Sequence, residues 1–279
     1  GNVHQMVAYK AEVELSDRGQ TRILDAYVRV LPIKGLAFTL GQVKKQFSTD
    51  NLRSPHNMLF ANPAFIVSEF ANLRDVGFTA GYNAKEYVPI EAILGVYNGN
   101  GLYDQKIWKK HFDYSARLIF NTCKYFAFDL NWQSIKPENV RMNVFDLAMR
   151  ADFYGVHLEA EGAYKIYQNS VFKPSYGFTG TAYYDIMLPK VFHHLRVLGR
   201  YDMITDDYDG SELIEEGVGT VYPITTSARQ RITAGVTLSL ADPILAELRI
   251  NYEKYFHKDW SAVKADDQDK LVIEIVARF

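Results

Sequence analysis

The sequence predicts an all-β chain that forms a single domain over residues 1–279, a transmembrane, antiparallel up-and-down β-barrel. We expect about 14 strands, with roughly 12 or 16 as alternatives. Three observations support this prediction: segments that alternate in period two, a rhythm of short and long connections, and a high content of aromatic residues. Period-two alternation places successive side chains on opposite faces of a strand, which suits a wall between lipid and an inner space.

The last stretch of the chain, 270–279, shows the alternation most clearly. One face carries Leu271, Ile273, Ile275, Ala277 and Phe279. The other face carries the charged residues of the stretch. The length of 270–279 also matches the roughly 9–11 residues that a barrel strand needs. We therefore expect a lipid-facing strand whose Phe279 acts as a C-terminal signal for barrel assembly.

The composition limits the class of protein. Aromatic residues make up 14% of the chain, with 19 Tyr and 17 Phe, as expected for aromatic girdles at two membrane interfaces. The balance of 31 basic and 33 acidic residues argues against nucleic-acid binding. The single Cys123 provides no disulfide framework. Gly1–His4 lack signal-peptide features, so we expect a mature chain in the bacterial outer membrane.

The same alternation recurs from the first residues onward, with turn-forming residues between the segments. The predicted strands are, in order, Val7–Leu15, Leu24–Val30, Leu36–Gln42, Val76–Tyr82, Ile90–Tyr97, Phe112–Phe120, Phe126–Trp132, Arg141–Phe153, Val156–Ile166, Tyr176–Met187, Phe192–Met203, Arg229–Leu240, Leu245–Tyr255 and Lys270–Phe279.

Long connections alternate with turns of about three to six residues after the first hairpin, as in barrels with short periplasmic turns and long external loops. The first long connection, residues 44–74, includes a possible short helix at Ala64–Leu73. A loop of this length in a compact domain is usually functional. The other long connections are Asn98–Lys110, Gln133–Val140, Gln168–Ser175, Ile204–Ser227 and Phe256–Asp269.

Charged residues gather on the face opposite to the apolar one. Burying so many ions in a dry core is prohibitive, so we expect a water-filled interior. The predicted basic pore-lining residues are Lys10, Arg29, Arg117, Arg150, Arg196, Arg200, Arg229, Arg231 and Arg249. The predicted acidic ones are Asp129, Asp146, Glu159 and Glu161.

The spacing of the arginines predicts a basic stripe along the strands from Arg196 to Arg249, opposite an acidic arc. Guanidinium groups bind carboxylate and phosphate well, which favours anions. The mixture of signs would also orient dipolar solutes, so strict anion selectivity does not follow. The alternative for any single residue is that it pairs with a charge on the next strand.

Several motifs resemble the phosphate-selective porin O and P family of outer-membrane porins. The resemblance covers about Leu24 to Gly101 and the closing strands from Arg231 to Phe279. It rests on the segments Leu24–Val28, Pro32–Leu36, Leu40–Ser48, Leu73–Gly77 and Gly95–Gly101.

The resemblance implies a homotrimeric porin whose loop 44–74 folds into the pore. The residues that would flank this constriction are Lys44, Lys45, Arg53 and Arg74. Family members commonly have about sixteen strands, and Val43 and Gln46 stand where the family often has Phe and Pro. Because the wall charges are mixed, we extend the family's pore and inward-folded loop to this chain, but not its specificity for phosphate.

The resulting prediction is a porin for passive diffusion of small hydrophilic solutes, with a possible preference for anions or phosphate, and not an enzyme. We expect no cofactor, no metal and no nucleic acid; the partners are outer-membrane lipid and the barrel-assembly machinery. His193 and His194 are neighbours on a strand and should face opposite sides. The alternatives are a barrel enzyme such as a lipid hydrolase, using a Ser with a His such as His157, and a soluble ligand-binding β protein.

Overall fold

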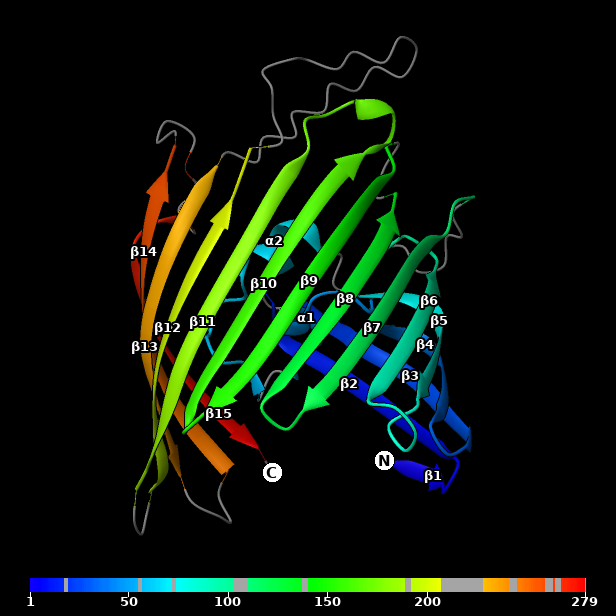
Figure 1. Ribbon diagram of the computed structural model, residues 1–279, viewed down its shortest axis with the longest axis horizontal. Helices are drawn as coiled ribbons and strands as arrows, with labels where there is room; N and C mark the ends of the chain where they lie inside the picture. The colour runs from blue at the N-terminus through cyan, green and yellow to red at the C-terminus, as the bar shows by residue number, and fades with distance from the viewer. Residues whose placement is uncertain are drawn as a thin grey trace.

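The computed structural model shows one antiparallel sheet in which each strand pairs with its neighbours in sequence (Figure 1). It describes residues 1–17, 20–54, 57–71, 74–102, 110–136, 140–188, 192–206, 228–240, 245–258, 263 and 267–278. The prediction of an up-and-down antiparallel barrel is confirmed.

The sheet contains 15 strands. They are β1 (Asn2–His4), β2 (Val7–Asp17), β3 (Gln20–Ile33), β4 (Leu36–Lys44), β5 (Arg74–Asn83), β6 (Ile90–Tyr97), β7 (Asp113–Cys123), β8 (Phe126–Ile135), β9 (Met142–Phe153), β10 (Val156–Tyr167), β11 (Ser175–Met187), β12 (Phe192–Ile204), β13 (Arg229–Leu240), β14 (Leu245–His257) and β15 (Lys270–Arg278). The short β1 is the strand that the alternation did not predict. Within the described residues the ladder runs from β1 to β15, without a pair that joins β15 to β1 or β2.

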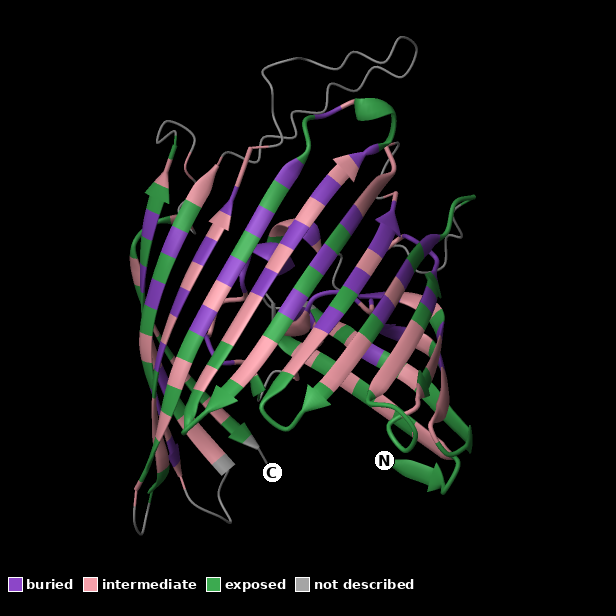
Figure 2. Ribbon diagram, in the orientation of Figure 1, coloured by how far each residue is buried: buried purple, intermediate pink, exposed green. Residues whose placement is uncertain are grey.

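Burial alternates along the strands, as the bands in Figure 2 show. On β13 the side chain of Ile232 is 48% exposed, whereas its neighbour Arg231 is 3% exposed. On β15 the apolar Leu271 and Ile273 are more than half exposed. The predicted segregation of faces therefore holds along these strands, with aliphatic residues outside and polar residues inside. Phe279 lies outside the described residues.

Two short α-helices interrupt the connection between β4 and β5: α1 (Thr49–Leu52) and α2 (Phe65–Phe70). A 3₁₀ turn, η2 (Gln168–Ser170), follows β10. No helix in the described residues combines the length and the apolar composition needed to cross a membrane. Helix α2 lies within the predicted range 64–73, whereas α1 was not predicted.

The main apolar cluster lies inside the curved sheet, between α2 and the wall. It contains Phe47, Phe65, Ile66, Phe70, Val144, Ala163, Ile204 and Tyr255. Helix α2 contacts β10, β11 and β12. Close packing here depends on Gly177 of β11, because a Cβ atom at this position would lie 3.0 Å from both Ile66 and Phe70.

Candidate pore constriction

The segment between β4 and β5 enters the space that the sheet encloses, where α1 and α2 are visible behind the strands (Figure 1). Most of its large apolar side chains are buried: Phe47 and Ile66 are 0% exposed and Phe60 is 3% exposed. Ser48 caps α1 by accepting a hydrogen bond from the Asn51 backbone N–H, at 3.4 Å. Three groups of polar contacts hold this segment, residues 45–71, against the wall. We call it the inner loop.

The first group of contacts lies at the start of the inner loop. The Nζ atom of Lys45 lies 2.6 Å from Asp113 and 3.2 Å from Asp75, and all three side chains are at most 1% exposed. The backbone N–H of Gln46 donates to the hydroxyl of Tyr97 at 3.2 Å. Lys45 therefore ties the inner loop to β5 and β7 by a fully buried ion pair.

The second group involves α1 and the acidic residues of β8 and β10. The Thr49 backbone N–H donates to Glu161, and its hydroxyl donates to Asp129, both at 3.2 Å. Arg53 forms an ion pair with Glu159. Burial acts to lower the pKa of Arg53, but the charge of Glu159 and a hydrogen bond to it outweigh this effect and raise the pKa.

The third group involves the arginines of β12 and β13. Arg200 donates to the backbone carbonyl of Asn62 at 3.0 Å, and Arg231 donates to that of Pro63 at 2.7 Å. Their guanidinium groups also lie over the rings of Phe60 and Phe65, at 4.4 Å and 4.5 Å from the ring centroids. These arginines thus hold the inner loop instead of facing open water.

The remaining arginines of the predicted basic stripe contact acidic side chains. Arg229 pairs with Glu69 of α2. Arg196 lies 2.7 Å from Asp185, and Arg249 lies 2.7 Å from Glu247. The stripe is therefore an alternation of both signs. Arg196 pairs with a charge on the neighbouring strand, as in the alternative prediction, whereas Glu69 lies on α2 and Glu247 lies on the same strand as Arg249.

The other predicted basic residues have the following contacts. Lys10 and Arg74 both bind Asp25, at 2.5 Å and 2.8 Å. Lys44 donates to the carbonyls of Asn51 and Arg53, at 2.7 Å and 2.6 Å. Arg117 pairs with Asp129, whose other oxygen lies 3.4 Å from Arg150. Arg29 donates a hydrogen bond to the hydroxyl of Thr39 at 3.2 Å.

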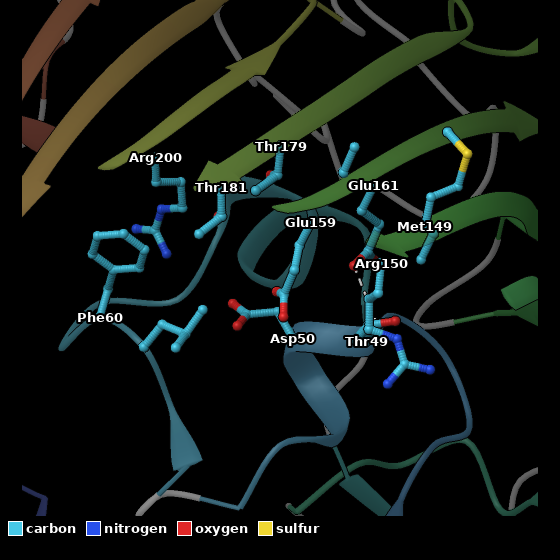
Figure 3. A pocket seen from close by; sticks show the side chains of 13 residues that line it. Thr49, Asp50, Phe60, Met149, Arg150, Glu159, Glu161, Thr179, Thr181 and Arg200 are labelled. Atoms are coloured by element: carbon cyan, nitrogen blue, oxygen red, sulfur yellow. Dashed lines mark hydrogen bonds between the residues drawn. The ribbon is translucent and has the colours of Figure 1, made fainter. Parts of the chain in front are cut away.

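A first cavity lies between α1 and the strands β9 to β12 (Figure 3). Asp50, Glu159 and Glu161 reach it together with Arg150 and Arg200. The predicted acidic arc therefore faces α1, and Asp146 is bound by Asn131 beside it. The cavity volume is only about 30 Å³, so the inner loop nearly fills this part of the interior.

A second, more open cavity lies against β3, β4, β5 and β6. The volume of this cavity is about 580 Å³. Among the residues that line it, Arg29 was predicted to face the pore, whereas Thr39, Thr79 and Glu91 were not singled out. The alternation of the two threonines with exposed apolar residues carried a signal, but uncharged hydroxyl groups are inconspicuous in a search for charge. The charge of Glu91 was a signal that the sequence analysis did not use.

The structure brings one Ser and one His together on the inner face. The Ser239 hydroxyl lies 3.1 Å from Nε2 of His194 and 3.2 Å from Glu247. The other ring nitrogen of His194 lies 2.9 Å from Nδ1 of His193 instead of contacting a carboxylate. This arrangement lacks the carboxylate that orients the histidine of a catalytic triad. In the described part of the chain, no three His, Cys, Asp or Glu side chains group as metal ligands would.

The fold is similar to solved structures of outer-membrane proteins. In-vitro folded OmpT, an outer membrane protein of Vibrio cholerae, aligns with a TM-score of 0.52 and 10% identity, over 98% of this chain and 83% of that one. OccD3 (OpdP) of Pseudomonas aeruginosa aligns with a TM-score of 0.52 and 11% identity, over 97% and 81% of the two chains. At these identities the likeness shows a shared barrel architecture.

No family model matches the sequence, and no curated protein matches it. The resemblance to the phosphate-selective porin O and P family therefore stays a prediction.

Proposed function

We propose that this protein is a porin of the bacterial outer membrane, a water-filled channel for the passive diffusion of small hydrophilic solutes. The observation that carries the proposal is the combination of an aliphatic outer face with a polar interior that the inner loop narrows. Exposed apolar side chains such as Leu118, Ile232 and Leu271 suit lipid, where a charge at the midplane costs about 2–4 kcal/mol. The barrel fold shared with OmpT and OccD3 supports the outer-membrane location. The trimeric state remains a prediction from the family resemblance, and recognition by the assembly machinery remains a prediction from the C-terminal strand.

The test is single-channel recording of detergent-purified protein in a planar bilayer. A porin should give discrete, ohmic current steps in potassium chloride. Protein that inserts without conducting would contradict the channel and favour a closed or enzymatic barrel. Hydrolysis of a lipid ester that depends on both Ser239 and His194 would support the enzyme, and solubility without detergent would support the soluble ligand-binding protein.

We further propose a modest preference for anions, supported by Arg29 and Arg150. Among the predicted basic residues, these two line the cavities with accessible guanidinium groups: Arg29 is exposed, and the Arg150 side chain is 39% exposed. The corresponding groups of Arg200 and Arg231 are buried against the inner loop. A preference for phosphate in particular would appear as block of the chloride current by added phosphate.

The Arg150→Gln variant is expected to lower the ratio of anion to cation permeability roughly twofold, because removing a charge about 8 Å from an ion in water changes its energy by about 0.5 kcal/mol. The reversal potential in a salt gradient measures this ratio. Lys124→Gln is the matched control, since Lys124 lies in the exposed turn between β7 and β8, beside Tyr125. Equal shifts in the two variants, or no shift in Arg150→Gln, would contradict the role of Arg150.

A further inference from the structure

We propose that the second cavity, against β3 to β6, is a subsite for uncharged polyhydroxylated solutes of the saccharide type. The inference rests on the proposed porin function and names the solute class that this wall of the pore accommodates. It follows from the chemistry of the lining, its charge balance and the room available beside the inner loop.

The polar side of this cavity offers hydrogen-bonding groups of both kinds. Thr39 and Thr79 line it from neighbouring strands, and Gln46 of the inner loop lines it as well. Asn83 donates to Glu91 at 2.8 Å, so an amide and a carboxylate lie side by side at its edge. Hydroxyl and amide groups both donate and accept hydrogen bonds, as sugar hydroxyls do. The lining therefore matches an uncharged partner that carries many hydroxyl groups.

The same cavity also has an apolar side, formed by Leu31, Ala37 and Ile93. A sugar ring presents C–H groups on its faces and hydroxyl groups at its edge. Ligand sites commonly combine an apolar lining with a few polar groups that fix orientation. An inorganic ion would gain nothing from the apolar surface, whereas a saccharide would contact both kinds of lining.

The charged groups that line the cavity each contact a protein group, and the Arg29 guanidinium stays accessible beside its partner. Arg29 donates to Thr39, Glu91 accepts from Asn83, and Lys34 at the rim pairs with Glu86. The first cavity is more highly charged, because Asp50, Glu159 and Glu161 line it together with two arginines. A neutral solute can thus bind the β3 to β6 wall without separating an ion pair.

The available space also distinguishes the two cavities. The volume of about 580 Å³ lies within the usual range of roughly 300–1,000 Å³ for small-molecule sites. The first cavity, at about 30 Å³, holds little more than water. Solutes larger than an ion therefore have room along β3 to β6, on the side of the interior away from the arginines of β12 and β13.

The experiment measures the block of single-channel current by sucrose, added to protein that already conducts potassium chloride. We expect a saturable decrease in current for the native chain. Thr79→Val removes a hydroxyl group while keeping the shape of the side chain, and should raise the half-blocking concentration about two- to tenfold. Thr181→Val is the matched control, because Thr181 lines the first cavity. Its half-blocking concentration should equal that of the native chain.

A second variant tests the location by filling the space. A Cβ atom at Gly81 would lie 3.4 Å from the nearest atom, on Ile93, so Gly81→Leu projects into the cavity at ordinary contact distance. It should abolish sucrose block while salt conductance remains. Gly162→Leu is the control, since no atom lies within 4 Å of a Cβ there.

Salt conductance without sucrose block would overturn the saccharide subsite and leave the porin intact. An equal rise in the half-blocking sucrose concentration in Thr79→Val and Thr181→Val would do the same. Absence of salt conductance in the native chain would instead overturn the porin function and the subsite with it.

Discussion

The Arg231→Met variant is expected to lose about 3–5 kcal/mol of free energy of unfolding and to conduct more current than the native chain. Arg231 is 3% exposed and binds Asp202 at 2.8 Å and the Pro63 carbonyl at 2.7 Å. Methionine preserves much of the apolar contact with Phe65, but it leaves Asp202 and Glu253 with less positive charge nearby. Loss of the Pro63 contact should also release the inner loop from the wall.

Two measurements test this prediction. Tryptophan fluorescence monitors urea unfolding of the protein in lipid vesicles, and recording in a planar bilayer gives the single-channel conductance. Arg196→Met is the control from the same stripe, because Arg196 pairs with Asp185 and both side chains are partly exposed. It should unfold within about 1 kcal/mol of the native chain. Equal destabilisation of the two variants, or unchanged conductance in Arg231→Met, would show that the Pro63 contact does not hold the inner loop.

The Lys45→Met variant is expected to be destabilised by a similar amount, about 3–5 kcal/mol, because it leaves Asp75 and Asp113 buried with their cation removed. Both carboxylates also accept backbone hydrogen bonds, from Gly99 and Lys136 respectively, so the damage should extend to the ends of β6 and β8. The temperature at which the folded band disappears in an SDS gel measures the loss.

Two further variants separate charge from shape at Lys45. Adding Asp113→Asn to Lys45→Met removes one of the two uncompensated charges and should restore part of the lost stability. Lys34→Met removes an exposed ion pair, with side chains 80% and 50% exposed, and should leave the transition temperature unchanged. Failure of Asp113→Asn to restore any stability would show that the buried pair contributes through packing and not through charge.

The strands were predictable because each is a local pattern. Alternation along β13, for example, separates Ile232 from Arg231 without reference to any other part of the chain. The predicted strand Leu24–Val30 ends before the observed end of β3, which continues through Pro32 to Ile33. Local turn signals compete there with pairing between Ile33 and Leu36.

The organisation of the interior was less predictable, because it depends on contacts between distant parts of the sequence. Alternation placed Arg200 and Arg231 on the inner face and predicted that they faced the solute. Their partners are the backbone carbonyls of Asn62 and Pro63, and a carbonyl group has no sequence signature. Helix α1 escaped prediction because four residues are too few to show a helical period.

The contacts of the inner loop also constrain the order in which the barrel folds. Asn62 binds Glu253, 191 residues further along the chain, and Pro63 binds Arg231, 168 residues further along. Contacts of such separation form slowly, since a long chain segment must first be ordered. An intermediate that lacks β13 and β14 keeps the contact between Arg200 of β12 and the Asn62 carbonyl, but it lacks the contacts of this part of the loop with Glu253 and Arg231. The inner loop can therefore be attached to the earlier strands first, and its attachment is completed only after β13 and β14 have joined the sheet.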